Sequence, residues 1–73
     1  MALQKDSVGP EVIKWQRFLI SKGYSIDSAD GIFGSKIDVA TRDWQARNGL
    51  ASDGVVGKNS LAKARAQGLL MTE

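Results

Sequence analysis

Apolar residues recur at three- and four-residue spacing in three separate stretches of the chain, and this spacing predicts three helices. The first predicted helix begins at Pro10, because proline fits a first helical position where its missing N–H is not needed. It ends at Gly23, since glycine readily adopts the left-handed conformation that stops a helix. The residues on its apolar face are Val12, Trp15, Phe18 and Leu19.

The second predicted helix begins at Ser35 and ends at Asn48-Gly49. Asp38 follows Ser35 by three residues, which resembles a capping box, in which two side chains satisfy N–H groups of the first turn. The residues on the apolar face of this helix are Ile37, Ala40, Thr41 and Trp44.

The third predicted helix is shorter, from Lys58 to Gly68, and Leu69 and Leu70 are expected to fold back onto its last turn. Its apolar residues are Leu61, Ala62 and Ala64. No alternating pattern of strand length appears, so the fold class is all-α, a compact three-helix bundle. The apolar loop residues expected to close the ends of the core are Tyr24, Ile26, Leu50, Val55 and Val56.

The chain also contains a degenerate internal repeat. Trp15-Gln16 returns 29 positions later as Trp44-Gln45, and the Asp-Gly-x-x-Gly loop at 30–34 returns 23 positions later at 53–57. Each copy is expected to bury its apolar face on the other. Both tryptophans lie on apolar helix faces and are therefore expected in the core, while the two glutamines are expected to bond the loop backbones.

The two Asp-Gly-x-x-Gly loops have a structural interpretation. The glycine at the second position permits the positive φ of a tight turn. The aspartate is expected to accept bonds from backbone N–H groups two or three residues later, and the final glycine to allow close packing at the start of the next helix. In this interpretation neither aspartate contacts a ligand.

Composition excludes several function classes. The 73 residues suffice for one domain, and the absence of cysteine and histidine removes disulfides and the usual zinc ligands. A calcium loop with Gly31 at position six would place one carboxylate, Asp30, on a ligand position, so no metal and no cofactor are expected. Histidine and cysteine nucleophile pairs are absent, and the only glutamates are Glu11 and Glu73. No catalytic residue is expected, and the chain is not expected to be an enzyme.

The formal net charge is +2, and the basic and acidic residues are interleaved. Such a pattern favours a solvated surface over a nucleic-acid footprint, although basic and amide side chains on the third helix leave a nucleic-acid-binding domain as an alternative. No apolar run approaches the roughly 20 residues of a membrane span, and residues 1–9 lack the apolar region of a signal peptide. An adaptor that docks a protein partner is the other alternative.

With both repeat units in view, the chain resembles the peptidoglycan-binding domain family, the three-helix modules attached to bacterial and phage cell-wall hydrolases. The resemblance covers residues 8–66, through matching pieces at 9–12, 15–16, 23–24, 30–34, 48–50 and 53–57, and at Ala40, Arg42, Trp44, Gln45 and Leu61. The family often has leucine where Trp15 stands, phenylalanine where Trp44 stands, and Thr-Trp where Ser60-Leu61 stands. Each replacement keeps an apolar or capping role.

The resemblance implies non-catalytic binding of peptidoglycan, which targets a linked cell-wall hydrolase such as a phage endolysin to its substrate. It implies that the protein acts as a monomer at the bacterial cell wall or in the periplasm. If the protein is encoded by a phage, it is expected to be released from the cytoplasm to reach the wall. The expected division of the chain is a tail at 1–7, the binding domain at 8–68, and a tail or linker at 69–73.

A ligand site is expected along the first Asp-Gly loop and the second helix. The expected ligand-binding residues are Asp30, Ile32, Phe33, Asp38, Arg42 and Gln45. Arg42 has two interpretations of equal weight, a bidentate contact to a stem-peptide carboxylate and a surface ion pair with Asp38 one helical turn away.

Overall fold

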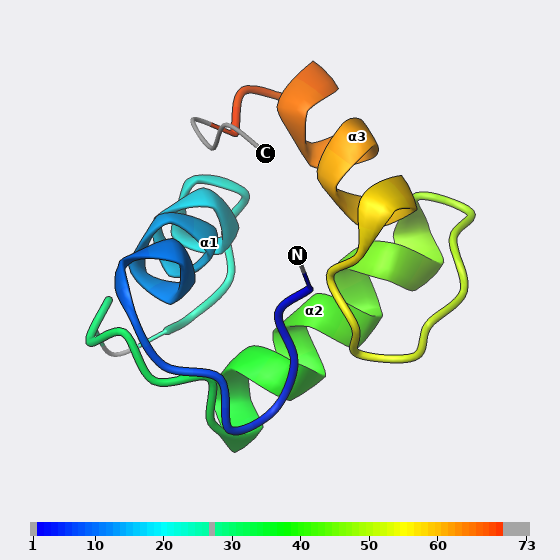
Figure 1. The fold of residues 1–73 in the computed structure, drawn as a ribbon. Coiled ribbons are helices and arrows are strands. Elements are labelled where there is room, and N and C mark those ends of the chain that lie inside the picture. Colours follow the sequence, from blue (N-terminus) through cyan, green and yellow to red (C-terminus); the bar gives the residue numbers. More distant parts are fainter. Residues whose placement is uncertain (1, 27, 70–73) are drawn as a thin grey trace.

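The computed structural model describes residues 2–26 and 28–69, which form three helices, α1 (Pro10–Ser21), α2 (Ser35–Arg47) and α3 (Lys58–Ala66). All three predicted helices are confirmed, and Figure 1 shows them arranged around a common centre. The all-α class is confirmed as well, because the extended pairing in the described part of the chain amounts to two isolated bridges. No helix among these residues is long and apolar enough to cross a membrane.

Three aromatic rings occupy the centre of the core. Trp15 stacks on Phe18 with ring centroids 5.2 Å apart, and Trp44 meets Trp15 edge-on at 5.3 Å. Buried indoles need a partner for their N–H. Nε1 of Trp15 donates to Oγ1 of Thr41 at 2.9 Å, and Nε1 of Trp44 donates to Oε1 of Gln67 at 3.2 Å. The prediction that both tryptophans belong to the core is confirmed.

The predicted apolar faces are buried with one exception, Ala62, which is exposed while the polar Ser60 beside it is buried. Four of the five loop residues expected to close the core do so, since Val56 is fully buried and Tyr24, Ile26 and Leu50 are partly buried and pack against the core. The fifth, Val55, lines a surface concavity. Leu69 folds back as predicted and donates its backbone N–H to the carbonyl of Ala64 at 3.0 Å. Leu70 lies outside the described residues.

The three helices begin at the predicted residues, but the cap of α2 differs from the prediction. Ser35 is the first helical residue of α2, one position too late to cap it, and the N-cap Gly34 makes no side-chain bond, so the capping-box prediction is wrong. The packing role given to the final loop glycine is also wrong. A Cβ added at Gly34 or Gly57 would meet nothing within 4 Å. Both residues are N-caps, a position at which glycine is well tolerated.

The segment before α1 joins the two Asp-Gly loops. Leu3 and Val56 exchange both backbone hydrogen bonds, at 3.1 and 2.7 Å. Further along, Phe33 donates its N–H to the carbonyl of Ser7 at 2.9 Å and accepts from the N–H of Asp6 at 2.8 Å. Leu3 is 5% exposed and belongs to the core. Leu3, Asp6 and Ser7, which fall in the expected tail at 1–7, are thus paired with the two loops. The sequence of this short segment is mostly polar and has no periodicity that would signal such pairing.

Replacing Leu3 with alanine should lower the free energy of unfolding by about 2–3 kcal/mol, because it removes a buried side chain and leaves a gap beside Val56. The measurement is the urea midpoint and slope followed by circular dichroism. Val8→Ala in the same segment is the matched control, since Val8 is 71% exposed. Equal midpoints for the two variants would contradict the role given to Leu3.

Candidate functional site

The first Asp-Gly loop is held by the amide of Gln16, a side chain that is 1% exposed. Its Nε2 donates to Oδ1 of Asp30 at 2.9 Å and to the carbonyl of Ile32 at 3.1 Å, and its Oε1 accepts from the N–H of Gly31 at 2.9 Å. Oδ1 of Asp30 also accepts from the N–H of Ile32 at 3.0 Å. We call this set of bonds the first clasp.

Gln45 forms the same bonds to the second loop. Its Nε2 donates to Oδ1 of Asp53 at 3.2 Å and to the carbonyl of Val55 at 2.9 Å, while its Oε1 accepts from the N–H of Gly54 at 3.0 Å. Oδ1 of Asp53 accepts from the N–H of Val55 at 3.0 Å. This second clasp has one further bond, from Nε2 to Oγ of Ser60 at 3.1 Å. The predicted bonding of both glutamines to the loops is confirmed.

The second-position glycines need both their positive φ and their missing Cβ. Gly31 and Gly54 have φ of 81° and 76°, as the loop chemistry predicts. A Cβ at Gly31 would come within 3.3 Å of the side chain of Ile13. At Gly54 it would lie 2.6 Å from Oδ1 of Asp38 and 3.0 Å from Nε of Arg42. Side chains on the preceding helix therefore press directly on each loop backbone.

The clasps fix the charge of both loop aspartates. The hydrogen bond from Gln16 and then the backbone N–H of Ile32 lower the pKa of Asp30 below its ordinary value. For Asp53 the largest cause of the lowered pKa is the backbone N–H of Val55, followed by the bond from Gln45. Hydrogen bonds donated to a carboxylate stabilise its charged form and thereby lower its pKa. Both loops therefore present an ionised carboxylate at neutral pH.

A concavity of about 250 Å³ lies between the first loop and the start of α2, and we call it the first groove. Ile32, 54% exposed, forms an apolar wall beside the exposed carboxylate of Asp30. The other lining residues are Gln16, Ile26, Ser28, Gly34, Ser35, Lys36 and Ile37. A wider concavity of about 490 Å³ runs along α2 past Val39, and it shares Ser35 and Lys36 with the first groove. Together they make an elongated surface of mixed polarity.

The structure brings only two of the six expected ligand-binding residues into this groove, Asp30 and Ile32. Phe33 and Gln45 are fully buried, in the core and in the second clasp, and expose no atom to a ligand in this conformation. Ligand contact at all six residues stays a prediction. Ser35 and Lys36, at the start of α2, were not among the expected residues, although the site was expected to extend along the second helix.

Asp38 and Arg42, the remaining two of the six, lie against the second loop. Nε of Arg42 is 3.2 Å from Oδ2 of Asp38, and both side chains border Gly54. Nη1 of Arg42 also reaches the carbonyl of Ser52 at 3.5 Å. The structure thus contains the surface ion pair between Arg42 and Asp38 that one of the two interpretations expected. The pair occupies, against the second loop, the place that Ile13 holds against the first.

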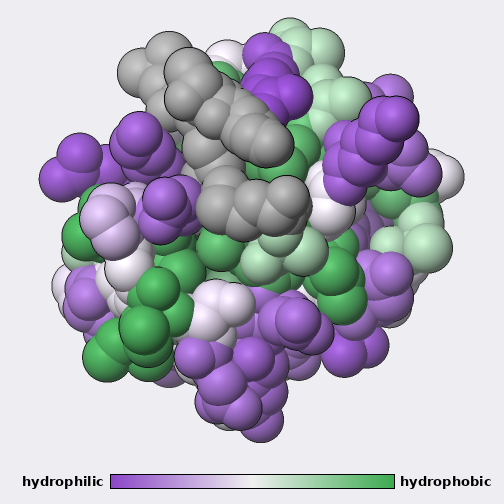
Figure 2. Space-filling view, viewed as in Figure 1, coloured by the Kyte–Doolittle hydropathy of each residue, from purple (hydrophilic) through white to green (hydrophobic). Residues whose placement is uncertain are grey.

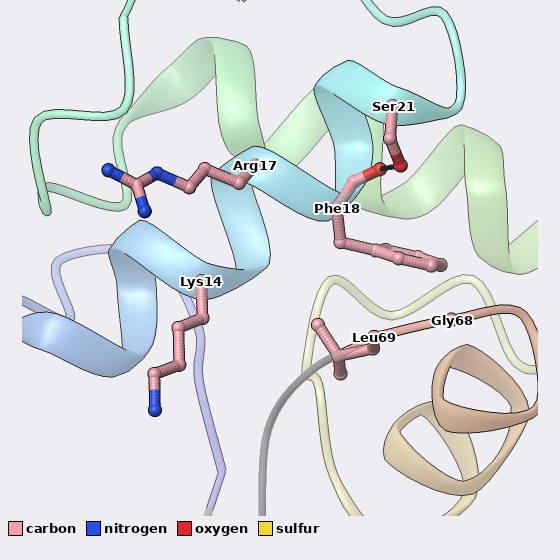
Figure 3. Close-up of a pocket in the computed structure, with 6 residues that line it drawn as sticks. All are labelled: Lys14, Arg17, Phe18, Ser21, Gly68 and Leu69. Carbon is pink, nitrogen blue, oxygen red and sulfur yellow. Dashed lines mark hydrogen bonds between the residues drawn. The ribbon is translucent and has the colours of Figure 1, made fainter.

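Another concavity, of about 340 Å³, opens where α1 meets the chain after α3 (Figure 3). Phe18 and Leu69 face each other across it, whereas the charged ends of Lys14 and Arg17 point away (Figure 3). It is therefore an edge of the core with few polar groups directed into it. On the face drawn in Figure 2, the hydrophobic surface is divided into small patches by hydrophilic side chains.

Replacing Gln16 with leucine should lower the free energy of unfolding by about 2–4 kcal/mol, because the N–H of Gly31 and the carbonyl of Ile32 would lose their partner. Thermal and urea unfolding measure the loss. Gln4→Leu is the control, since Gln4 is exposed and surface changes usually stay within about 0.5 kcal/mol. If Gln16→Leu lowered the free energy of unfolding no more than Gln4→Leu does, the first clasp would not stabilise the fold.

Stability should fall as the pH drops below about 4, the ordinary range of aspartate. Because the folded-state pKa of Asp30 and of Asp53 is lowered, each carboxylate stabilises the fold above its unfolded pKa. That stabilisation is lost as the pH falls through the folded pKa. In the Asp30→Asn/Asp53→Asn double variant, the melting temperature should decline less steeply between about pH 4 and pH 2.

The amide oxygen of asparagine can still accept the hydrogen bonds of both clasps. The double variant therefore differs from the wild type in the charge of these two side chains and keeps their bonds. Part of the acid sensitivity should remain, because the hydroxyl of Tyr24 and then Arg47 lower the pKa of Asp43. Identical pH profiles for the wild type and the double variant would show that the clasps do not govern acid stability.

Solved structures with the same fold include a phage endolysin, an L,D-transpeptidase and the N-terminal domain of SleB. The endolysin of Burkholderia phage AP3 superposes with a TM-score of 0.86 and 33% identity, over 92% of this chain and 26% of that one. The L,D-transpeptidase from Xylanimonas cellulosilytica has a TM-score of 0.85 and 39% identity, over 90% of this chain and 32% of that one. The N-terminal domain of SleB has a TM-score of 0.87 and 28% identity, over 92% of both chains.

The chain thus spans about a quarter of the endolysin and a third of the transpeptidase, but nearly all of the SleB domain. Its sequence matches the family model described as a putative peptidoglycan binding domain over residues 8–63, which include both clasps and all of α1 and α2. The predicted resemblance is confirmed. The chain belongs to the peptidoglycan-binding domain family.

Proposed function

We propose that this domain binds bacterial peptidoglycan without chemical turnover, through the first groove, and thereby holds a linked cell-wall enzyme at its substrate. The single observation that carries the placement is the first clasp, which fixes an exposed carboxylate and an exposed apolar side chain in one rigid loop. A preformed loop loses little conformational entropy on binding, so even a small groove gains affinity from it.

The chemistry of the first groove fits a glycopeptide polymer. The wall formed by Ile32 offers apolar surface to the face of a sugar ring, and the carboxylate of Asp30 accepts bonds from hydroxyl or amide groups. Ser35, at the start of α2, adds a hydroxyl that can donate or accept. An apolar surface with a few oriented polar groups is the usual composition of a ligand site.

The same groove is poorly equipped for hydrolysis. A general acid needs a pKa raised toward the working pH, whereas the pKa of Asp30 is lowered. Glycoside hydrolysis also needs a second carboxylate facing the first across the bond, and Asp30 is the sole carboxylate among the described residues that line the groove. These features support a role in attachment.

Attachment helps a linked enzyme by raising the effective concentration of its substrate, and modest affinity suffices for that. The endolysin and the transpeptidase, in which a domain of this fold occupies about a quarter to a third of the chain, suggest the kind of enzyme that would be linked. In the proposal Asp38 and Arg42 support the second loop, because their side chains pair with each other beside Gly54.

The test is co-sedimentation of the purified domain with insoluble peptidoglycan sacculi at low and high salt. Ile32→Asp should weaken binding roughly tenfold, a loss of about 1.4 kcal/mol, because it places a second negative charge in the apolar wall beside Asp30. Ile20→Asp is the matched control. Ile20 is also a partly exposed isoleucine, at 42%, and it lines neither the first groove nor the wider concavity beside it.

The expected result is wild-type binding that survives high salt, with weaker binding in Ile32→Asp and unchanged binding in Ile20→Asp. Binding that vanishes steeply with salt would instead favour a nucleic-acid-type electrostatic contact. Absence of co-sedimentation at any salt would overturn the proposal and direct attention to a protein partner.

A further inference from the structure

The second Asp-Gly loop borders a concavity of its own, of about 310 Å³, which we call the second groove. Six of its lining residues are Asp53, Val55, Gly57, Lys58, Asn59 and Ser60. Each of these residues follows a lining residue of the first groove by 23 positions. The two grooves are therefore built from corresponding positions of the two repeat units, between an Asp-Gly loop and the helix that follows it.

The loops beside the two grooves are fixed with nearly the same geometry. The bond from the glutamine to the loop glycine N–H measures 2.9 Å in the first clasp and 3.0 Å in the second. The bond from the aspartate to the backbone N–H two residues later measures 3.0 Å in both. The second loop is thus preformed to the same degree as the first, with an exposed Asp53 whose pKa is likewise lowered.

The chemistry of the second groove is also similar, with a shift toward polar groups. Val55 and the partly buried Leu50 supply the apolar wall, and the exposed Lys58 brings a cation to the rim beside Asp53. Ser60 stands where the first groove has Ile37, so the floor is more polar. A groove with one carboxylate, one ammonium and an apolar wall complements a ligand that carries hydroxyl, amide and carboxylate groups.

We infer that the second groove is a second peptidoglycan-binding site, so that one domain contacts the polymer at two points. The inference rests on the proposed function, because the occupant is identified through the correspondence with the first groove. A polymer of repeating units can fill two like sites at once, and the second contact then forms at high effective concentration. Its more polar floor makes the second site the weaker one for a shared fragment.

The experiment is a calorimetric titration of the domain with a soluble muropeptide, a disaccharide carrying its stem peptide, with amide shifts followed by NMR. Two sites of unequal affinity are expected in the wild type. Ile32→Asp should remove the first site and leave the second, with shifts at residues 53–60. Val55→Asp should remove the second site and leave the first, with shifts at residues 30–37. Lys58→Glu is a second variant in the second groove, and an acidic residue at a helix start does not oppose folding.

The control for Lys58→Glu is Lys63→Glu, an equal change of charge on an exposed residue of α3 that does not line the second groove. In co-sedimentation with sacculi, each single-groove variant should retain part of the binding, and Ile32→Asp/Val55→Asp should lose it.

A stoichiometry of one that Ile32→Asp abolishes and both second-groove variants leave intact would overturn the second site, while the proposed function would stand. Failure of the wild type to bind either the muropeptide or the sacculi would overturn the proposed function itself.

Discussion

Two buried glutamine amides organise this domain. Gln16 and Gln45 each project from a helix into the core and use both ends of the amide on one Asp-Gly loop. A buried amide without partners would be strongly unfavourable, and no buried side-chain N or O atom among the described residues lacks a partner. The bonds that satisfy each amide therefore also fix the helix and the loop relative to each other.

The small size of the domain makes these polar interactions important. Chains of about 60–70 residues bury a modest share of their surface, and many depend on disulfides or metals for stability. With no cysteine or histidine in the sequence, this chain relies on three aromatic rings in mutual contact and on polar bonds that link the loops to the core. The segment of residues 3–7 adds backbone pairs to both loops, so the loops are held from the helix side and from the N-terminal side.

The same construction suits a binding module. Ionised aspartates with lowered pKa are rigid hydrogen-bond acceptors and poor proton donors, which favours recognition over general acid catalysis. The grooves beside the loops are shallow and of mixed polarity, as attachment to a hydrated polymer requires. Each loop is fixed by its own clasp of the same design. The two grooves beside the loops differ mainly in lining side chains such as Ile37 in the first and Ser60 in the second.

The sequence by itself determined the helices, the aromatic core and the turn chemistry of both loops, since each depends on residues close together in the chain. Periodicity identifies the buried faces, and Asp-Gly identifies a turn with positive φ. Only the tertiary structure decided that Phe33 is buried and that Arg42 and Asp38 cover Gly54. It also decided the position of Leu3, which pairs with Val56 across more than fifty residues. Contacts of this kind join segments that are far apart in the chain, and local patterns do not signal which segments meet.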